Sequence, residues 1–182
     1  MSRWMLVVSL AAACGGARSR PALGSAAGGP AAGADDDPRR VPDGYVRMEA
    51  RDVVSVSEGG AVLLVDREGA KVLPIAIGGT EAVSIALRLH GLPSPRPLTH
   101  DLLDTVMRQL GGELVKVQVD RMVDGIFIGS IFIRTAGGTR RIDARPSDAI
   151  ALAIGNRAPI YVARAVLDRS GIEPPGLDAT QA

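Results

Sequence analysis

The sequence predicts an α+β domain whose mixed, mostly antiparallel sheet is covered by helices. Short runs rich in Val and Ile, separated by glycine turns, recur from residue 45 to residue 172 and are typical of strands. A purely parallel sheet would need a crossover after each strand, and most of these crossovers are missing. Hydrophobic residues form 46% of the 182-residue chain and aromatic residues only 3%, so the core must consist of Val, Ile, Leu and Ala.

In the first half of the domain, the spacing of apolar residues predicts three strands and one helix. We expect the strands at 46–56, 61–65 and 71–77, with turns at Glu58-Gly59-Gly60 and at 66–70. The segment 81–89 is predicted to be a helix, because apolar residues recur there at helical spacing at Ala82, Ile85, Ala86 and Leu89.

The second half begins after a proline-rich loop at 93–97. Thr99 is predicted as the N-cap of a helix that carries Leu102, Leu103, Val106 and Leu110 and stops at Gly111-Gly112. Strands at 114–119, 125–134 and 139–142 lead to an apolar helix at 146–154, for which Pro146 suits the first turn. A strand at 159–162 and a helix at 163–170 complete the pattern.

The two halves also resemble each other. Residues 65–87 align with residues 132–154 without a gap, and each copy reads strand, glycine turn, strand, corner and Ala-rich helix. In this alignment Glu81 falls on Asp148, so both acids would stand at equivalent helix starts. We interpret the pattern as an internal pseudo-duplication, against the alternative of chance similarity between two amphipathic segments.

The N-terminus resembles a bacterial lipoprotein signal. Arg3 is followed by an apolar run at 4–13 and then by Cys14, the only cysteine, which would carry the lipid. We therefore expect a signal peptide at 1–14, a flexible Gly/Ala/Pro linker at 15–43, the domain at 44–172 and a disordered tail at 173–182. The predicted location is the cell envelope, either lipid-anchored or periplasmic or secreted.

Two alternatives for this segment remain. Ala11-Ala12-Ala13 is also a site for an ordinary signal peptidase, because alanine stands at the third position before the cysteine where leucine is usual. A mis-assigned start would instead make the first forty or so residues an artefact and the protein cytoplasmic.

Charge and cysteine content exclude several classes of site. The net charge is +1, from 21 basic and 20 acidic residues, so the chain lacks the basic footprint typical of nucleic-acid binding domains. A single cysteine permits neither an internal disulfide nor a cysteine-based zinc site. Contact with a polyanion would have to come from a local cluster.

The residues that suggest chemistry all lie where a strand or loop enters a helix: Glu81, Arg96, His100, Asp101, Asp143, Arg145 and Asp148. Carboxylates with a histidine can hold Mg²⁺ or Mn²⁺, and arginines can bind phosphate oxygens. Together these groups are typical of metal-assisted hydrolysis of phosphodiesters.

Structural interpretations compete at each of these corners. Ser147 and Asp148 would both be explained as caps for the exposed amides of the helix that follows Pro146. Ion pairs Asp143–Arg145 and Asp148–Arg96 would lock the corners without catalysis. His100 would be either a hydrogen-bonded link between loop and helix, or a general base or metal ligand.

Four strings in order resemble the bifunctional nuclease (BFN) domain family across residues 45–171: LPIAIGGTEAVSIAL at 73–87, RPLTHDLL at 96–103, DGIFIGSI at 124–131 and IDARPSDAIALAIGNRAPIYV at 142–162. The resemblance implies an α+β domain that tends to dimerise and, from plant members, nuclease activity on RNA and DNA. His100, Asp101, Asp143, Arg145, Ser147 and Asp148 lie in these strings. Many relatives have tyrosine and alanine where Ile128 and Gly129 stand here.

Two hypotheses follow from these observations. In the first, an exported, lipid-anchored, dimeric nuclease uses Mg²⁺ or Mn²⁺ to cleave RNA or DNA. Its metal ligands would be Asp143 and Asp148 with Glu81, its proton-transfer group His100 or Asp101, and its phosphate ligands Arg96 and Arg145. In the second, the domain is a catalytically silent dimeric binding or scaffold module of the cell envelope, and the charged corners are structural or recognise a small anion.

Overall fold

The computed structural model describes residue 37 and residues 40–56, 59–67 and 70–173 of the chain. The predicted signal peptide with Cys14, Glu58 of the first predicted turn and residues 174–182 lie outside the described residues. Within the described part, no helix has the length and apolar character needed to cross a membrane.

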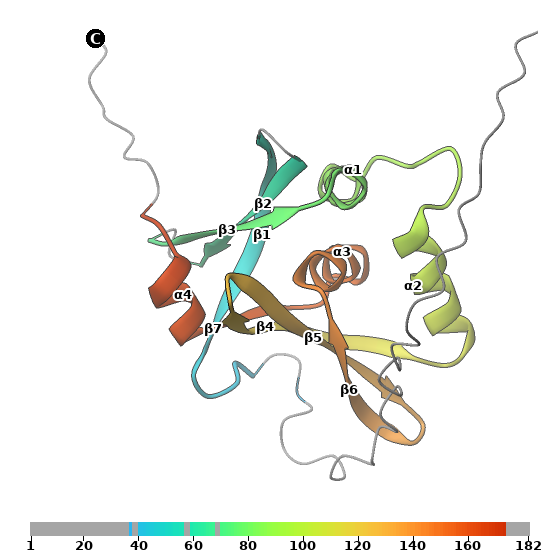
Figure 1. Cartoon of the computed structure of the whole chain (residues 1–182). Coiled ribbons are helices and arrows are strands. Elements are labelled where there is room, and N and C mark those ends of the chain that lie inside the picture. The colour runs from blue at the N-terminus through green and yellow to red at the C-terminus, as the bar shows by residue number, and fades with distance from the viewer. Residues whose placement is uncertain (1–36, 38–39, 57–58, 68–69, 174–182) are drawn as a thin grey trace, which may run out of the picture.

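The described residues form a seven-stranded sheet and four helices (Figure 1). The strands are β1 (Tyr45–Val56), β2 (Gly59–Asp66), β3 (Val72–Ile77), β4 (Glu113–Val123), β5 (Ile126–Thr135), β6 (Gly138–Ala144) and β7 (Ile160–Ala163). The helices are α1 (Gly79–Leu89), α2 (Thr99–Gln109), α3 (Pro146–Asn156) and α4 (Arg164–Ser170). Each element predicted from the sequence is present, with boundaries shifted by a few residues.

The sheet order is β3-β2-β1-β7-β4-β5-β6, and every neighbouring pair is antiparallel except β4 and β7. Two meanders, β1-β2-β3 and β4-β5-β6, are built from tight connections that allow only antiparallel pairing. The short strand β7 returns through α3 and joins the two meanders in the middle of the sheet. The α+β class and the mostly antiparallel sheet are therefore confirmed.

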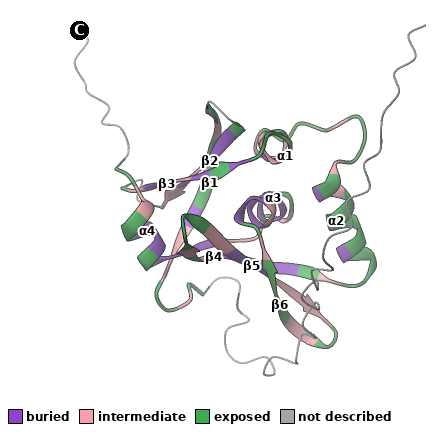
Figure 2. Cartoon of the chain, in the orientation of Figure 1, coloured by how far each residue is buried: buried purple, intermediate pink, exposed green. Residues whose placement is uncertain are grey.

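Helix α3 forms the centre of the core. Its residues from Ala149 to Ala153 are all buried, and the helix contacts α1 and α2 as well as strands β4 and β5. Figures 1 and 2 show α3 in the middle of the molecule, with α1 above it and the β4–β5 part of the sheet below. A helix that is apolar all round must be enclosed on all sides, which explains why the sequence of α3 has no polar face beyond its first turn.

The order of elements repeats between the halves. Each meander is followed by a helix, α1 after β3 and α3 after β6, and Glu81 and Asp148 are each the third residue of their helix. This order agrees with the alignment of residues 65–87 on 132–154, and the duplication itself stays a prediction.

Helix α2 differs from its prediction in two respects. Its N-cap is Leu98 rather than Thr99, and Asp101 Oδ2 accepts a hydrogen bond of 2.9 Å from the Leu98 amide. Its polar residues His100 and Asp104 are buried together with Met107, whereas Leu102, Leu103 and Val106 face outward, as does Leu110 at its C-cap. The cause is that α1 and α3 present hydrogen-bonding partners to the polar side chains of α2, as described below.

Gly129 in β5 lies where the sheet leaves no room for a side chain. A Cβ at this position would lie 2.9 Å from the Gln118 carbonyl oxygen and 3.1 Å from that of Ala144, and both are backbone atoms of neighbouring strands. An alanine at this position would therefore need a displaced strand in this chain.

We expect Gly129→Ala to lower the free energy of unfolding by about 1–3 kcal/mol, the usual cost of overpacking. Gly137→Ala is the matched control, because its Cβ would meet only Thr135 Oγ1 at 3.7 Å, an ordinary contact. Urea denaturation of both variants measures the difference. Equal midpoints for the two variants would contradict this account of Gly129.

Candidate functional site

The strongest cluster of chemically active side chains lies where α1, α2 and the start of α3 meet. Glu81 comes from α1, His100 from α2, and Arg145 with Asp148 from the corner between β6 and α3. Because Pro146 opens α3 without needing a hydrogen-bond partner for its nitrogen, the chain turns sharply here and leaves Arg145 as the N-cap residue. We refer to these four residues as the Arg145 cluster.

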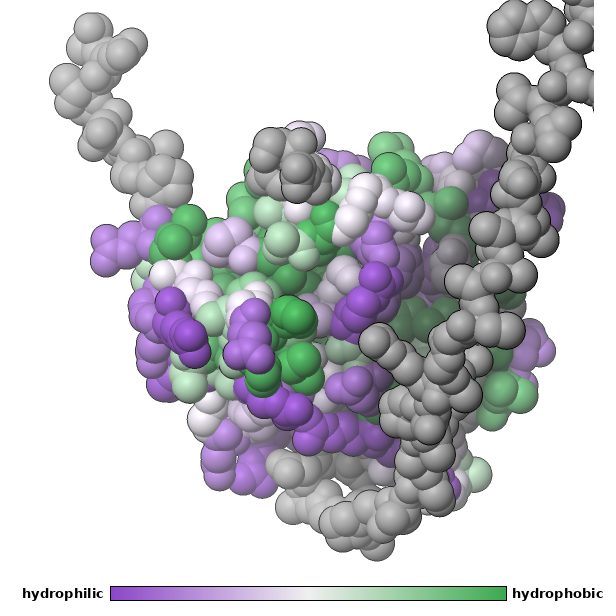
Figure 3. All heavy atoms as spheres, viewed as in Figure 1, coloured by the Kyte–Doolittle hydropathy of each residue, from purple (hydrophilic) through white to green (hydrophobic). Residues whose placement is uncertain are grey.

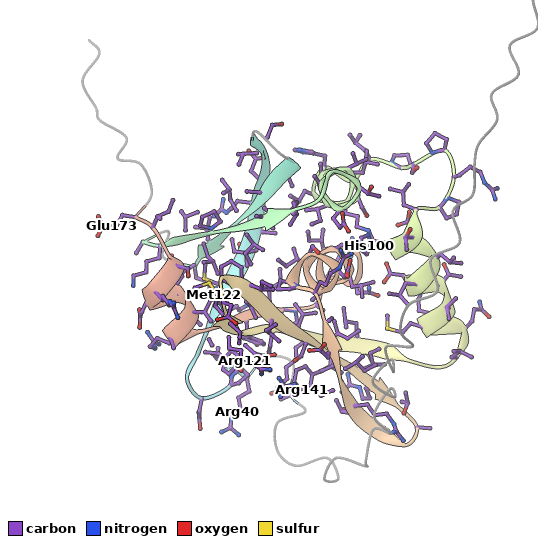
Figure 4. The ribbon with its side chains drawn as sticks, in the orientation of Figure 1. Arg40, His100, Arg121, Met122, Arg141 and Glu173 are labelled. Atoms are coloured by element: carbon purple, nitrogen blue, oxygen red, sulfur yellow. The ribbon has the colours of Figure 1, made fainter. Side chains whose placement is uncertain are left out.

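His100 is held at both ring nitrogens. Its Nδ1 lies 2.9 Å from Ser84 Oγ, and its Nε2 lies 3.1 Å from Asp148 Oδ1. The ring is 7% exposed, and Figure 4 places it between α2 and α3. An ionised carboxylate only accepts hydrogen bonds, so a neutral His100 must donate its Nε2 proton to Asp148 and accept the Ser84 hydroxyl proton at Nδ1.

Arg145 joins the two acids of the cluster. Its Nε donates to Asp148 Oδ2 at 2.7 Å and its Nη2 donates to Asp148 Oδ1 at 2.9 Å, a bidentate pair. The same Nη2 donates to Glu81 Oε1 at 2.6 Å. The side chain of Arg145 is nevertheless 67% exposed, so the cluster opens to solvent on the arginine side.

Hydrogen bonds keep both acids ionised. Burial alone would raise the pKa of Asp148, but bonds from Arg145 and His100 outweigh it and lower that pKa below its ordinary value. The pKa of Glu81 is lowered by its own backbone amide and by Arg145, and the pKa of Arg145 is raised by the same pairs. These bonds stabilise the fold above the ordinary carboxylate pKa, and that contribution is lost as the pH falls through the lowered values.

The acids of the cluster fit a divalent cation only in part. Among the described residues, no group of three or more His, Cys, Asp and Glu side chains is arranged to hold a metal ion. Glu81 Oε1 and Asp148 Oδ1 do converge on one atom, Arg145 Nη2. Mg²⁺ is often held by one or two carboxylates together with water and substrate phosphate, so these two oxygens suit it once the guanidinium has moved.

The other predicted site residues are not joined to this cluster. Asp143 lies opposite Ser130 in the sheet register, and Arg96 is exposed in the proline loop. Among the described residues, neither side chain makes a hydrogen bond or an ion pair. The two ion pairs weighed from the sequence are therefore absent. Arg145 pairs with Asp148 and Glu81 instead, because the turn at Pro146 places it beside these two acids.

The hydrogen-bonded caps expected of Ser147 and Asp148 are not formed among the described residues, although Asp148 does lie in the first turn of α3, where a carboxylate is favoured. The N-cap of α3 is Arg145, no side chain caps the helix, and Asp148 uses both oxygens on His100 and Arg145. Pro146 at the first position removes one of the amides that a cap would serve, which weakens the need for one.

Asp101 belongs to a second, structural network centred on Arg88 of α1. Arg88 Nη2 pairs with Asp101 at 2.7 Å and with Asp104 at 2.8 Å, while its Nη1 donates to the Ala151 carbonyl of α3 at 2.8 Å. Asn156 of α3 donates to the other Asp104 oxygen at 2.7 Å. These bonds tie α1, α2 and α3 together, and they explain why the polar side of α2 faces inward.

A further polar group lies on the strands β1, β4, β5 and β6. The Asp120 side chain is 5% exposed and accepts hydrogen bonds from the Tyr45 hydroxyl at 2.8 Å, from Ser130 Oγ and from Arg141 Nη2 at 2.8 Å. Figure 4 labels Arg141 near this group, below the sheet strands. Every oxygen of the carboxylate is occupied, so we assign this group to the architecture of the sheet.

The tyrosines of this protein should resist ionisation. Burial and the Asp120 carboxylate raise the pKa of Tyr45 to about 12, and burial raises that of Tyr161. The chain has only these two tyrosines, so absorbance of tyrosinate near 295 nm reports both. We expect clearly less tyrosinate in the folded protein than in denaturant at a pH just above the ordinary tyrosine pKa of about 10.

Because the pKa of Tyr45 is raised in the folded state, folding favours the neutral, protonated form of its phenol. This preference stabilises the folded state below the ordinary tyrosine pKa of about 10 and is lost as the pH rises through 12. Tyr45→Phe should remove the later part of the titration. Ionisation of both tyrosines near pH 10 in folded protein would contradict the arrangement around Asp120.

Ser84 is the one member of the site that sequence reasoning missed. It lies within the apolar face of α1 and is buried, so its spacing resembles that of an ordinary core position. The only available signal was a hydroxyl among Ile and Ala residues in the first string of the family resemblance.

Comparison with known proteins matches the chain to a family. The model of the bifunctional nuclease domain matches residues 62–175, well over half of the chain. An uncharacterized protein of Mycobacterium tuberculosis is 38% identical over 130 residues, which cover 71% of this chain and 77% of the relative.

Two plant relatives are named as nucleases. Bifunctional nuclease 1 of Oryza sativa subsp. japonica is 25% identical over 117 residues, or 62% of this chain, and bifunctional nuclease 2 is 25% identical over 121 residues, or 65% of this chain. The matched regions are 35% and 37% of these rice proteins, so this chain spans about a third of their length.

Proposed function

Because the chain belongs to the bifunctional nuclease domain family, we propose that it hydrolyses phosphodiester bonds in RNA or DNA. The observation that carries the proposal is the hydrogen-bonded series Ser84, His100, Asp148 and Arg145, which ends in an exposed guanidinium. A histidine oriented by two hydrogen bonds can relay a proton, and an arginine open to solvent can bind phosphate.

Each residue of the cluster has a proposed role. Arg145 binds a phosphate oxygen, since it is the exposed cation of the site and its planar fork matches phosphate geometry. His100 transfers a proton, and Asp148 fixes which of its nitrogens carries that proton. Glu81 positions Arg145 from the opposite side through its hydrogen bond to Nη2.

We further propose that Mg²⁺ or Mn²⁺ assists the reaction with Glu81 and Asp148 as its ligands. When bound, such a cation supplies Lewis-acid stabilisation of the charge that develops on phosphate oxygens. Transfer of the Arg145 guanidinium from the two carboxylates to the substrate phosphate would free the oxygens that the cation needs. Asp143, which no described contact joins to these acids, is not part of this ligand pair.

A cleavage assay tests the function directly. Full-length protein is incubated with single-stranded RNA and DNA in Mn²⁺, Mg²⁺ or EDTA, with Arg145→Gln purified in parallel to reveal contaminating nuclease. Cleavage that requires the cation and is lost in the variant supports the proposal. Cleavage that persists in EDTA would reject the metal while keeping the nuclease, and activity equal in the variant would reject both.

The alternative function is a catalytically silent binding or scaffold module. It is favoured by one observation: Arg145, Glu81 and Asp148 are all paired with one another within the cluster, as in structural ion pairs. The net charge of +1 agrees with this view. Figure 3 shows hydrophilic and hydrophobic side chains interspersed on one face of the molecule. Absence of cleavage under every cation in the assay would move the assignment to this module.

We also propose that the domain dimerises through the outer face of α2. Its exposed large side chains are Leu102, Leu103, Val106 and Leu110, the last with 79% of its surface accessible. The stripe bears no charge, so two copies can meet antiparallel about a two-fold axis without like-charge repulsion. A strict monomer in light scattering at tens of micromolar would reject this, and Leu103→Glu should convert a dimer to a monomer.

The membrane partner is proposed from the sequence alone. Cys14 is the proposed lipid attachment site after removal of the first thirteen residues, with the cell envelope as the location. Mass spectrometry of the mature N-terminus in a bacterial host distinguishes the outcomes. A diacylated cysteine supports the anchor, cleavage after Ala13 without lipid indicates secretion, and an intact N-terminus would reject export.

A further inference from the structure

A cavity of about 300 Å³ lies between the end of α1, the proline loop and the start of α2. Its walls are mostly apolar, formed by Leu87, Leu92, Pro93, Pro97 and Leu98. Four polar residues also line it: Ser84, Arg88, Ser94 and Asp101. A largely apolar cavity with a few convergent polar groups is typical of a small-ligand site.

The polar lining selects the chemistry of the ligand. The Asp101 side chain is 40% exposed. Burial alone would raise the pKa of its carboxyl group, but hydrogen bonds from the Leu98 amide and from Arg88 outweigh burial and lower that pKa. Each of its oxygens keeps a further lone pair. A phosphate would be repelled by this carboxylate, whereas a neutral ring with N–H donors on one edge would be attracted to it.

Ser84 connects this cavity with the candidate site. The same side chain lines the cavity and holds His100 Nδ1 at 2.9 Å, and His100 in turn contacts Asp148. A ligand in the cavity therefore lies one side chain from the histidine and a short series of hydrogen bonds from Arg145. This arrangement suits a nucleotide whose phosphate is at Arg145 and whose base is in the cavity.

We propose that the cavity is a nucleobase subsite of this domain and that it prefers guanine. The assignment rests on the proposed function for its phosphate end, and on the cavity alone for its base end. Guanine offers two adjacent N–H donors on its Watson–Crick edge, which can satisfy both oxygens of Asp101, while uracil offers one. The apolar walls would contact the two faces of the ring, in place of aromatic side chains, none of which line the cavity.

Binding of 3′-GMP and 3′-UMP to the full-length protein tests the subsite without any cleavage. The two ligands share the same ribose and phosphate, so the difference between their dissociation constants reports the base. Isothermal titration calorimetry should show 3′-GMP binding about tenfold more tightly, the discrimination expected for one bidentate contact. Equal dissociation constants, or no binding of either ligand, would overturn the proposal.

Two variants assign the preference to the cavity. Asp101→Asn should remove most of it, but this variant also weakens bonds to Leu98 and Arg88 and can unfold the helix start. Leu92→Trp is independent of that risk, because Leu92 is half exposed and the larger ring fills the cavity. The matched control is Ile126→Trp at the start of β5, an exposed residue that does not line the cavity.

Loss of the guanine preference in Leu92→Trp but not in Ile126→Trp supports the subsite. A preference that survives Leu92→Trp would place the base elsewhere and overturn it. The result is separable from the nuclease assay, because base-selective binding without cleavage would keep the subsite and reject the hydrolytic function. Cleavage without base-selective binding would keep the hydrolytic function and reject the subsite.

Discussion

Replacing Asp148 with asparagine should lower phosphodiester cleavage by about 10²- to 10⁴-fold, the usual contribution of positioned proton transfer. Asparagine keeps the shape of the side chain but removes the charge that orients His100 and binds Arg145. It also removes one of the two carboxylates proposed as cation ligands. The loss should appear in the maximal rate under saturating cation, because the substrate still meets Arg145.

The same substitution should leave the domain folded. No side chain caps α3, so Asp148→Asn removes no cap, and its ion pair with a largely exposed arginine contributes at most about 1 kcal/mol. Circular dichroism melting of the purified variant checks this expectation. If the domain instead melts near room temperature, Asp148 is primarily a structural residue.

Asp143→Asn is the matched control for Asp148→Asn. Both residues belong to the same string of the sequence, but Asp143 is exposed and makes no side-chain bond among the described residues. We expect Asp143→Asn to cleave at nearly the parental rate. Equal losses in the two variants would indicate that Asp143 joins the site when substrate binds, as the sequence alone suggested.

Periodicity predicted the order of the elements well, because each strand and helix of this chain carries its own local pattern. The apolar run at 146–154 could only be an enclosed helix, and Pro146 marked its start. The alignment of the two halves also predicted that Glu81 and Asp148 stand at equivalent helix starts, and the structure brings both acids to Arg145. These inferences needed only residues close in sequence, or one internal comparison.

The partners of individual side chains were beyond such reasoning. Arg145 pairs with an acid 64 positions earlier in the chain, and His100 with residues 16 and 48 positions away. The orientation of α2 was also hidden, since its leucines have the spacing of a core face and yet point outward. Which face is buried depends on what α1 and α3 offer, and that is a property of the assembled fold.

Arg88→Met should lower the free energy of unfolding by about 3–5 kcal/mol, the largest stability effect that we expect. Both the Arg88 and Asp104 side chains are 9% exposed, so the variant leaves the Asp104 carboxylate buried without its cation. Asn156 alone would then hold that charge. Gly155 shows how closely the guanidinium packs on α3, because a Cβ at that residue would collide with Arg88 Nη1.

The measurement is urea denaturation, with Arg134→Met as the matched control. Arg134 pairs with Glu113, but its side chain is 39% exposed and that of Glu113 is 69% exposed, so this loss should stay below about 1 kcal/mol. The double variant Arg88→Met with Asp104→Leu should recover much of the stability, because no buried charge then remains unpaired. Recovery would show that charge pairing, rather than packing of the arginine stem, fixes the inward orientation of α2 and with it the position of His100. If the double variant is as unstable as Arg88→Met alone, the stem carries the stability, and the polar inner face of α2 would require another cause.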